Sequence, residues 1–219
     1  MPKNNNVSTL YKTPFSPSYW KQAIADSKNI RMVTLAALLI ALRLIIKNLS
    51  IPIAEGMTIY FGYLLNALGA MIYGPIMAIL TGFVSDILGF FLFPTGYAFF
   101  FGYTITAMAG SFIYALFFYR SRMSILRIIL AKLSVNVFVN IGLGALWSSM
   151  MFGKGYLYYL LRSVTKNLVM LPVEILLMYL FFQAILPALQ TLKLVPRQPS
   201  KRIPFFRHKE ATKTETIEK

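Results

Sequence analysis

The sequence predicts an all-α integral membrane protein with six transmembrane helices and both termini in the cytoplasm. Three observations lead to this fold class. The 219 residues are 57% hydrophobic and only 13% charged, whereas a soluble domain needs about a quarter of its residues charged to cover its surface. The apolar residues concentrate between positions 30 and 190, and the net charge of +15 comes mostly from the two ends.

Both ends of the chain are polar and basic. Residues 1–31 contain five Lys or Arg against Asp26 alone, and residues 191–219 contain eight against three Glu. Lys and Arg collect on the cytoplasmic side of membrane spans, whereas a nucleic-acid-binding protein interleaves such charges with aromatic residues on a folded face. We therefore expect a cytoplasmic segment at 1–29, a transmembrane domain at 30–190 and a cytoplasmic tail at 191–219, with lipid rather than nucleic acid as the surrounding partner.

The apolar region has room for about six helices, since one span takes about 20 residues and a connection. Glycine, proline and basic residues mark where each span stops. Pro172 falls inside the last span, where a kink is tolerated if neighbouring helices satisfy the freed carbonyl. The predicted spans are 30–50, 58–73, 75–93, 97–119, 123–152 and 157–190. The corresponding breaks are Pro52, Gly74-Pro75, Pro94-Thr95-Gly96, Arg120-Ser121-Arg122 and Gly153-Lys154-Gly155.

Ionisable residues inside the apolar region are the main functional signals, because they are costly in a membrane and usually face the bundle interior or an aqueous cavity. Lys47 and Lys132 are expected to extend toward the lipid headgroups. Arg43 is expected to face the bundle interior.

Lys154, Arg162 and Lys166 are different, because they surround an external connection where positive charge opposes the topology rule. Arg162 and Lys166 are about 40° apart on a helix, so both can face one cavity. An anionic ligand from outside would use them, since the guanidinium of Arg matches a carboxylate. An internal ion pair with Glu174 or Asp86 is the alternative.

The fifth span carries Asn136, Asn140, Leu143 and Trp147 on one α-helical face. Two amides and an indole suit a flat heteroaromatic ligand, which they would hydrogen-bond at its edge and stack on its face. Hydrogen bonding between helices is an equally good explanation for the Asn residues. In the first span, Ala37 and Ala41 form a small-residue ridge that permits close approach of another helix.

Catalysis has little support. The chain has no cysteine, and its single histidine, His208, lies in the C-terminal tail. A zinc site and a Ser-His-Asp triad are therefore not expected within the bundle. The segment around Gly153-Lys154-Gly155 departs twice from a P-loop. We expect no enzyme activity, no metal and no bound cofactor.

Several segments together resemble the substrate-binding S components of energy-coupling factor (ECF) transporters, and among these the folate-specific ones. The resemblance covers nearly all of residues 30–190. The segments are RLIIKNLSIPIAE (43–55), FGYLLNALGAMIYGP (61–75), SDILGFFLFPTG (85–96) and, as the most specific, ALWSSMMFGKGYLYYLLRSVTKNLVMLPVE (145–174).

The resemblance implies a bacterial cell-membrane protein that binds folate with high affinity from outside. Such a protein docks on a transmembrane coupling protein and two cytosolic ATP-binding cassette ATPases, which supply the ATP hydrolysis. Ala37 and Ala41 would form the docking surface for the coupling protein. The family model also has the S component topple in the membrane to deliver its ligand.

Folate has a flat pterin, an aromatic middle and a glutamate tail with two carboxylates. We expect the tail to pair with Lys154, Arg162 or Lys166. The rings would stack on Trp147, Tyr60, Phe61 and Tyr103. The pterin edge would bond to Asn136, Asn140, Asn167 and Asp86. The loop from Pro52 to Met57 is a candidate lid.

Two other functions stay open. One is an S component for another flat vitamin, although cationic thiamine suits the external cations poorly and neutral riboflavin leaves them unexplained. The other is a self-sufficient secondary carrier for an organic anion, which would transport without ATPases.

Overall fold

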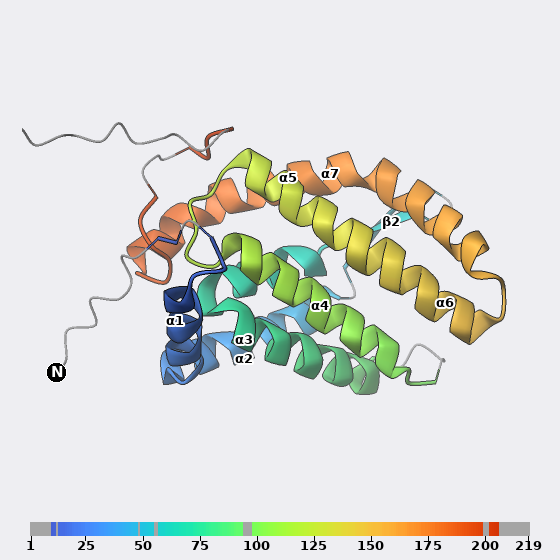
Figure 1. The fold of residues 1–219 in the computed structure, drawn as a ribbon, viewed down its shortest axis with the longest axis horizontal. Helices are drawn as coiled ribbons and strands as arrows, with labels where there is room; N and C mark the ends of the chain where they lie inside the picture. Colours follow the sequence, from blue (N-terminus) through green and yellow to red (C-terminus); the bar gives the residue numbers. More distant parts are fainter. Residues whose placement is uncertain are drawn as a thin grey trace, which may run out of the picture.

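The computed structural model describes residues 10–11, 13–47, 49–54, 57–93, 98–198 and 202–205. This part of the chain forms an elongated bundle of helices with a short β hairpin at its side (Figure 1). The elements in chain order are α1 (Pro17–Ser27), α2 (Ile30–Ile46), β1 (Ser50–Ala54), β2 (Met57–Tyr60), α3 (Gly62–Leu92), α4 (Phe101–Phe118), α5 (Ile125–Ser134), the π-helix η2 (Val135–Leu143), α6 (Gly144–Phe152) and α7 (Tyr156–Thr191).

The helices fit a membrane environment. Four stretches are long and apolar enough to cross a bilayer: Gly62–Leu92, Phe101–Phe118, Ile125–Phe152 and Tyr156–Thr191. The pair α1 and α2, bent by 77°, would add a fifth if it counts as one broken span. Only 17% of the apolar stretch of α7 is buried inside the protein, so most of its apolar surface is available to lipid. The prediction of an all-α, multi-pass membrane protein is confirmed at this level.

A β hairpin connects α2 to α3, and it occupies residues that were predicted to belong to the ends of the first two spans. β1 and β2 pair antiparallel, with Ser50 opposite Tyr60. The predicted span 58–73 therefore begins too early, and the predicted span 30–50 ends too late, because α2 stops at Ile46. Thr58, Ile59 and Tyr60 are β-branched or aromatic residues that favour a strand. Part of the candidate lid, Glu55 and Gly56, lies outside the described residues.

α3 consists of two arms that meet at Gly74. This glycine has φ 80° and ψ −177°, a conformation that is essentially restricted to glycine. Ser111 of α4 donates a hydrogen bond of 2.7 Å to Asn66 in the first arm, and its Oγ lies 2.9 Å from the position of a Cβ on Gly82 in the second arm. The arms 62–73 and 75–92 therefore run side by side in opposite directions, as the predicted break at Gly74-Pro75 requires.

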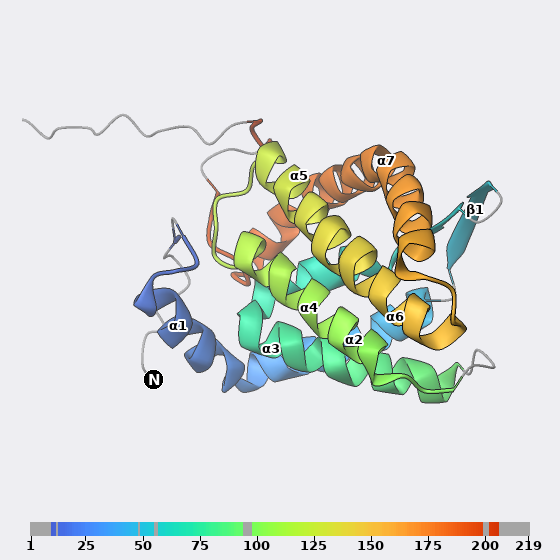
Figure 2. The same cartoon turned by 45° about the vertical axis from the view of Figure 1, so that its right-hand side comes forward.

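α5, η2 and α6 form one continuous rod (125–152), which runs along α7 (Figures 1 and 2). Its centre, Val135–Leu143, is a π-helix. π-helices make i→i+5 hydrogen bonds, are rare and occur frequently at functional sites. The rod and α7 agree closely with the predicted spans 123–152 and 157–190.

α1 packs across one end of the bundle. It lies inside the segment 1–29, which the charge pattern predicted to be a polar cytoplasmic tail. Its inner face buries Tyr19, Ala23 and Asp26. The Asp26 carboxylate pairs with Arg120 at 3.0 Å and accepts a hydrogen bond of 2.6 Å from Tyr119. Burial raises the pKa of the Tyr19 hydroxyl above its ordinary value, so that hydroxyl stays protonated and donates to the Ala115 carbonyl.

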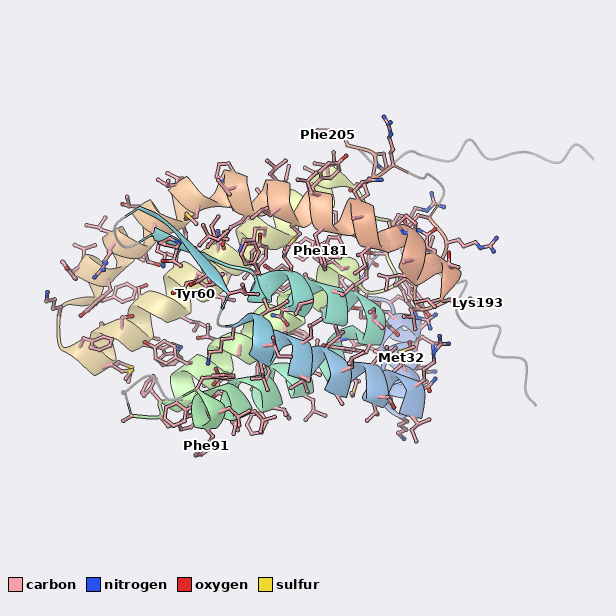
Figure 3. The ribbon with its side chains drawn as sticks, turned by 180° about the vertical axis from the view of Figure 1, so that it is seen from behind. Met32, Tyr60, Phe91, Phe181, Lys193 and Phe205 are labelled. Atoms are coloured by element: carbon pink, nitrogen blue, oxygen red, sulfur yellow. The ribbon has the colours of Figure 1, made fainter. Side chains whose placement is uncertain are left out.

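The same end brings distant parts of the chain together. Arg31, at the start of α2, donates a hydrogen bond of 2.9 Å to the carbonyl of Leu192, which follows α7. Figure 3 accordingly shows Met32 and Lys193 at one end of the molecule and Phe91 toward the other. The site described next lies toward that other end.

Candidate functional site

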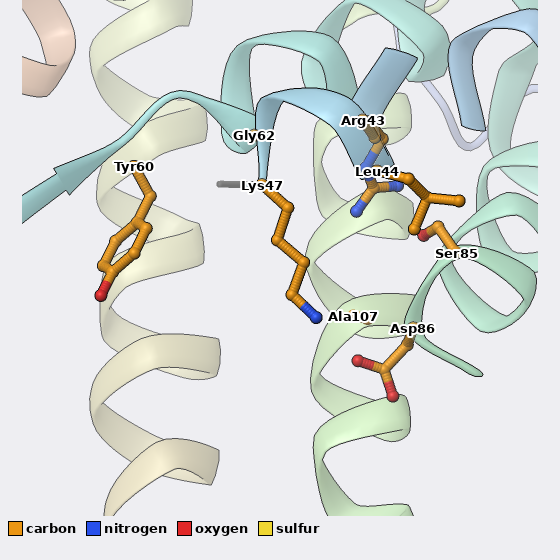
Figure 4. Close-up of a pocket in the computed structure, with 8 residues that line it drawn as sticks. All are labelled: Arg43, Leu44, Lys47, Tyr60, Gly62, Ser85, Asp86 and Ala107. Carbon is orange, nitrogen blue, oxygen red and sulfur yellow. The ribbon is translucent and has the colours of Figure 1, made fainter. Parts of the chain in front are cut away.

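Three neighbouring cavities form the candidate site. The first has a volume of about 260 Å³ and lies among α2, β2, the second arm of α3 and α4 (Figure 4). Its polar lining includes Arg43, Lys47, Tyr60 and Asp86. The ends of the Lys47 and Asp86 side chains point toward each other across it.

The second cavity, of about 400 Å³, shares Lys47 and Asp86 with the first, so the two adjoin. Its remaining lining is almost entirely aromatic, and it comes from the end of α3, the start of α4 and the end of α6. The aromatic residues are Phe90, Phe93, Phe99, Phe100, Tyr103 and Phe152.

The third cavity is the largest, at about 560 Å³, and it shares Tyr103 and Phe152 with the second. It lies between α4, the rod and the start of α7. Lys154, Arg162 and Lys166 all line it, together with neutral hydrogen-bonding groups that include Asn140 and Ser163. The site is therefore a row of three cavities with cations at both ends and aromatic rings between them.

Local geometry explains the position of the three cations. Arg162 and Lys166 lie one turn apart on α7 and are exposed. Lys154 follows Gly153, whose φ of 69° turns the chain from α6 toward α7, and its Nζ lies 4.7 Å from the centre of the Tyr158 ring. Glu174, one candidate internal partner for Arg162 or Lys166, instead pairs with Lys132 at 3.0 Å.

The predicted stripe of Asn136, Asn140 and Trp147 does not lie on a single face, so that prediction was wrong. The two Asn residues belong to the side that contacts α7, and Trp147 belongs to the side that contacts α4. Asn140 donates to Asn136 at 2.9 Å and to Asn167 of α7 at 3.3 Å. Trp147 faces α4 instead. The prediction assumed about 3.6 residues per turn over the whole span. The π-helix over Val135–Leu143 has more residues in each turn, so Trp147 points in a different direction from the two Asn residues.

Trp147 is held on the first turns of α4. Its Nε1 donates a hydrogen bond of 3.0 Å to Thr106 Oγ1, and its ring lies 5.7 Å from that of Phe100. A Cβ on Gly102 would lie 2.7 Å from the indole, so glycine is needed at this position for Trp147 to pack closely. Trp147 thereby supports Phe100, which lines the second cavity.

The polar groups of the first cavity are held from three helices. Arg43 donates to Asn66 at 3.3 Å, and Thr104 of α4 donates to Asp86 at 2.8 Å. Lys47 donates to the Gly89 carbonyl at 3.1 Å and lines two cavities rather than only extending to the headgroups.

The expectation that Lys132 extends to the headgroups was wrong. Its side chain is 2% exposed. The buried carboxylate of Glu174 offers it an ion pair, which the sequence does not reveal because the two residues are far apart along the chain.

The candidate residues thus separate into two groups. Those that line the three cavities are Arg43, Tyr60, Asp86, Tyr103, Asn140, Lys154, Arg162 and Lys166. Those that do not are Phe61, Asn136, Trp147 and Asn167. Phe61 packs against the hydrophobic core, and the other three hydrogen-bond to residues around the cavities.

Sequence reasoning missed the aromatic lining of the second cavity. Phe90, Phe93, Phe99 and Phe100 flank the break at Pro94-Thr95-Gly96 on both sides. Their density around this break was the available signal. It was overlooked because phenylalanine is common enough in membrane helices to be taken for lipid contact.

The two candidate docking residues lie apart from the cavities. Ala37 and Ala41 are exposed on the outer face of α2, whereas Met32, Ala36 and Leu39 form its buried face.

Comparison with known proteins places the chain in a family. Residues 27–192 match the family described as "ECF-type riboflavin transporter, S component". The folate transporter FolT of Clostridium novyi (strain NT) is 30% identical over 155 residues, which are 69% of this chain and 88% of that protein. FolT of Leuconostoc mesenteroides subsp. mesenteroides is 31% identical over 155 residues, 68% of this chain and 83% of that protein.

A solved structure, described as a crystal structure of FolT bound with folic acid, is 29% identical in sequence. It superposes with a TM-score of 0.61 over 69% of this chain and 92% of that chain.

Proposed function

The chain belongs to the family of ECF-type riboflavin transporter S components, and from this premise we propose that it is a folate-binding S component. The observation that carries the proposal is the row of three cavities with Lys154, Arg162 and Lys166 at one end and an aromatic middle. Folate is long, aromatic and anionic at one end, so its shape and charge match this row. Two relatives named as folate transporters and a related structure with bound folic acid support the same ligand.

The proposed binding mode follows the row. The two carboxylates of the glutamate tail pair with Arg162, Lys166 and Lys154 in the third cavity, where Arg162 offers a planar fork for one carboxylate. Asn140 lines this third cavity rather than the first, so we assign it to the amide of the tail instead of the pterin edge. Asn136 and Asn167 hold Asn140 in place.

The aromatic rings occupy the second cavity, between the phenylalanines and Tyr103, with Trp147 supporting Phe100 from behind. The pterin reaches the first cavity, where Asp86 accepts hydrogen bonds from its amino edge and Arg43 donates to its carbonyl. Tyr60 closes this cavity from the β hairpin, and the connected Phe61 keeps the hairpin fixed to the core.

We also propose six crossing segments in residues 30–190: α2, the two arms of α3, α4, the rod and α7. The first arm, residues 62–73, rises only about 18 Å, less than the hydrocarbon core of about 30 Å. The β hairpin continues from it, and such non-helical backbone is tolerated at membrane depth where it lines a cavity.

Both ends of the chain, 1–29 and 191–219, would then lie in the cytoplasm. The exposed cations Lys21, Lys28, Lys193 and Arg197 at the α1 end support this orientation.

Transport requires partners in this proposal. A transmembrane coupling protein docks against the exposed face of α2 at Ala37 and Ala41, whose small side chains permit close helix packing. Two cytosolic ATP-binding cassette ATPases supply the energy, consistent with a sequence that lacks a P-loop.

Vesicle transport tests this arrangement and distinguishes it from a self-sufficient carrier. Vesicles that contain the chain together with a coupling protein and both ATPases should accumulate labelled folate when ATP is inside, and vesicles with the chain alone should not. Gradient-driven uptake by the chain alone would contradict the proposal.

Riboflavin is the second candidate ligand, because the family description names it. It is uncharged on its ring system and sugar-like chain, so it leaves Arg162 and its neighbouring cations without a role. Competition between folate and riboflavin for the purified protein decides between the two ligands.

A further inference from the structure

A buried ion pair joins α5 to α7 within the membrane domain. Lys132 Nζ and Glu174 Oε2 lie 3.0 Å apart, and their side chains are 2% and 16% exposed. Two ionised groups are costly to bury, and an apolar pair of similar volume often stabilises a protein at least as well. Ionisable residues inside a membrane protein are therefore functional candidates, and neither residue touches the three cavities.

The pair also involves the first arm of α3. The Lys132 ammonium lies 4.3 Å from the centre of the Tyr63 ring, a distance at which a cation is attracted by an aromatic face. The Tyr63 hydroxyl donates a hydrogen bond of 3.0 Å to the Glu174 backbone carbonyl. Lys132, Glu174 and Tyr63 thus fix three helices relative to one another at a single point.

A ladder of hydrogen bonds starts at Asn136, four residues along the rod from Lys132, and leads to the third cavity. Asn136 lies four residues after Lys132 on the rod, is 2% exposed and accepts from Asn140. Asn140 also donates to Asn167, and Asn167 donates to Ser163, both on α7. Asn140 and Ser163 line the cavity that holds Arg162 and Lys166. Any slide of α7 along the rod would break this ladder.

We propose that Lys132 and Glu174 are positioning residues for ligand binding. The pair holds α7 against the rod in the one register that presents Arg162, Lys166 and Asn140 to the same ligand. Hydrophobic contacts between two membrane helices do not select a register strongly, whereas one buried charge pair does. This inference rests on the proposed function, because the ligand that reports on the register is folate.

The experiment compares folate affinity with thermal stability in purified variants. Glu174→Gln leaves the Lys132 cation without its anion, so both the melting temperature and the affinity should fall, the affinity by about tenfold. The double variant Lys132→Met/Glu174→Met removes both charges. Its melting temperature should recover, since no orphaned charge remains, while its affinity should stay low because the register is no longer specified.

Two further variants separate positioning from mere stability. Phe182→Leu trims a fully buried α7 side chain that packs on Phe118, away from the ladder. It should lower the melting temperature but change the affinity by no more than about twofold. The reversed pair Lys132→Glu/Glu174→Lys should regain a large part of the affinity.

Unchanged folate affinity in both Glu174→Gln and the double variant would overturn the inference and leave the pair a purely structural role. If Glu174→Gln does not fold, the double variant gives the decisive comparison. A wild-type chain that does not bind folate would contradict the proposed function itself and remove the inference with it.

Discussion

Lys47 Nζ donates a hydrogen bond of 3.1 Å to the carbonyl oxygen of Gly89. This bond ties the C-terminal end of α2 to the second arm of α3 where the first and second cavities meet. A Cβ on Gly89 would lie 3.0 Å from Nζ, closer than an ordinary contact, so a side chain at residue 89 would push the ammonium away from the carbonyl.

Gly89→Ala should displace the Lys47 ammonium and weaken folate binding by about fivefold, about the free energy of one hydrogen bond in a folded protein. Lys47→Met should have a similar effect. Fluorescence titration with folate measures both. Gly110→Ala is the matched control, because its Cβ would meet only Val139 at an ordinary 3.9 Å. Equal folate affinities in Gly89→Ala and Gly110→Ala would show that the hydrogen bond between Lys47 and Gly89 does not matter for folate binding.

Arg162→Ala should weaken folate binding by about 10- to 100-fold, because a charge-assisted hydrogen bond to a carboxylate contributes about 1.5–3 kcal/mol. Pteroic acid, which lacks the glutamate tail, should bind wild type and variant with nearly equal affinity. Arg197→Ala removes an exposed cation at the other end of the molecule and should leave both affinities unchanged. If Arg162→Ala weakens both ligands equally, Arg162 does not act on the tail.

Gly74→Ala should destabilise the protein by about 3 kcal/mol, because φ 80° with ψ −177° is strained for alanine. Its Cβ would also lie 2.9 Å from the Tyr119 ring. Gly153→Ala is the comparison, with φ 69° but nothing within 4 Å of its Cβ, and it should cost only about 1 kcal/mol. Thermal unfolding in detergent measures both variants. An equal loss would mean that the antiparallel arrangement of the α3 arms does not depend on Gly74.

Asp26→Asn should lower stability by about 3 kcal/mol without changing folate affinity, because it breaks the buried pair with Arg120 at the end opposite the cavities. Melting temperature and folate titration of the same sample test the two halves of this prediction. A fall in affinity would show that α1 is coupled to the ligand site.

Several helix ends could be predicted because glycine and proline mark them. Gly74-Pro75 breaks an otherwise uninterrupted apolar run, and the structure turns there. The β hairpin could not be predicted in the same way, since Thr58, Ile59 and Tyr60 continue an apolar pattern that a helix also allows. α1 was obscured because its charges resemble those of a tail, although Tyr19, Ala23 and Asp26 repeat with helical spacing.

The cations of the third cavity were predictable because positive charge on a connection that is expected to lie outside contradicts the topology rule, and Arg162 and Lys166 follow α-helical spacing. Trp147 was misplaced because no residue pattern reveals a π-helix. The pairing of Lys132 with Glu174 joins two distant segments of the chain, so only the packed bundle reveals it.

Direct titration of the purified chain tests the central proposal, the binding of folate. Trp147 adjoins Phe100 beside the second cavity, and a Trp20→Phe background leaves it as the only tryptophan. Folate should quench its fluorescence in a saturable manner, and riboflavin and thiamine should not displace the bound folate. Saturable binding of riboflavin in preference to folate, or no saturation with folate, would contradict the account.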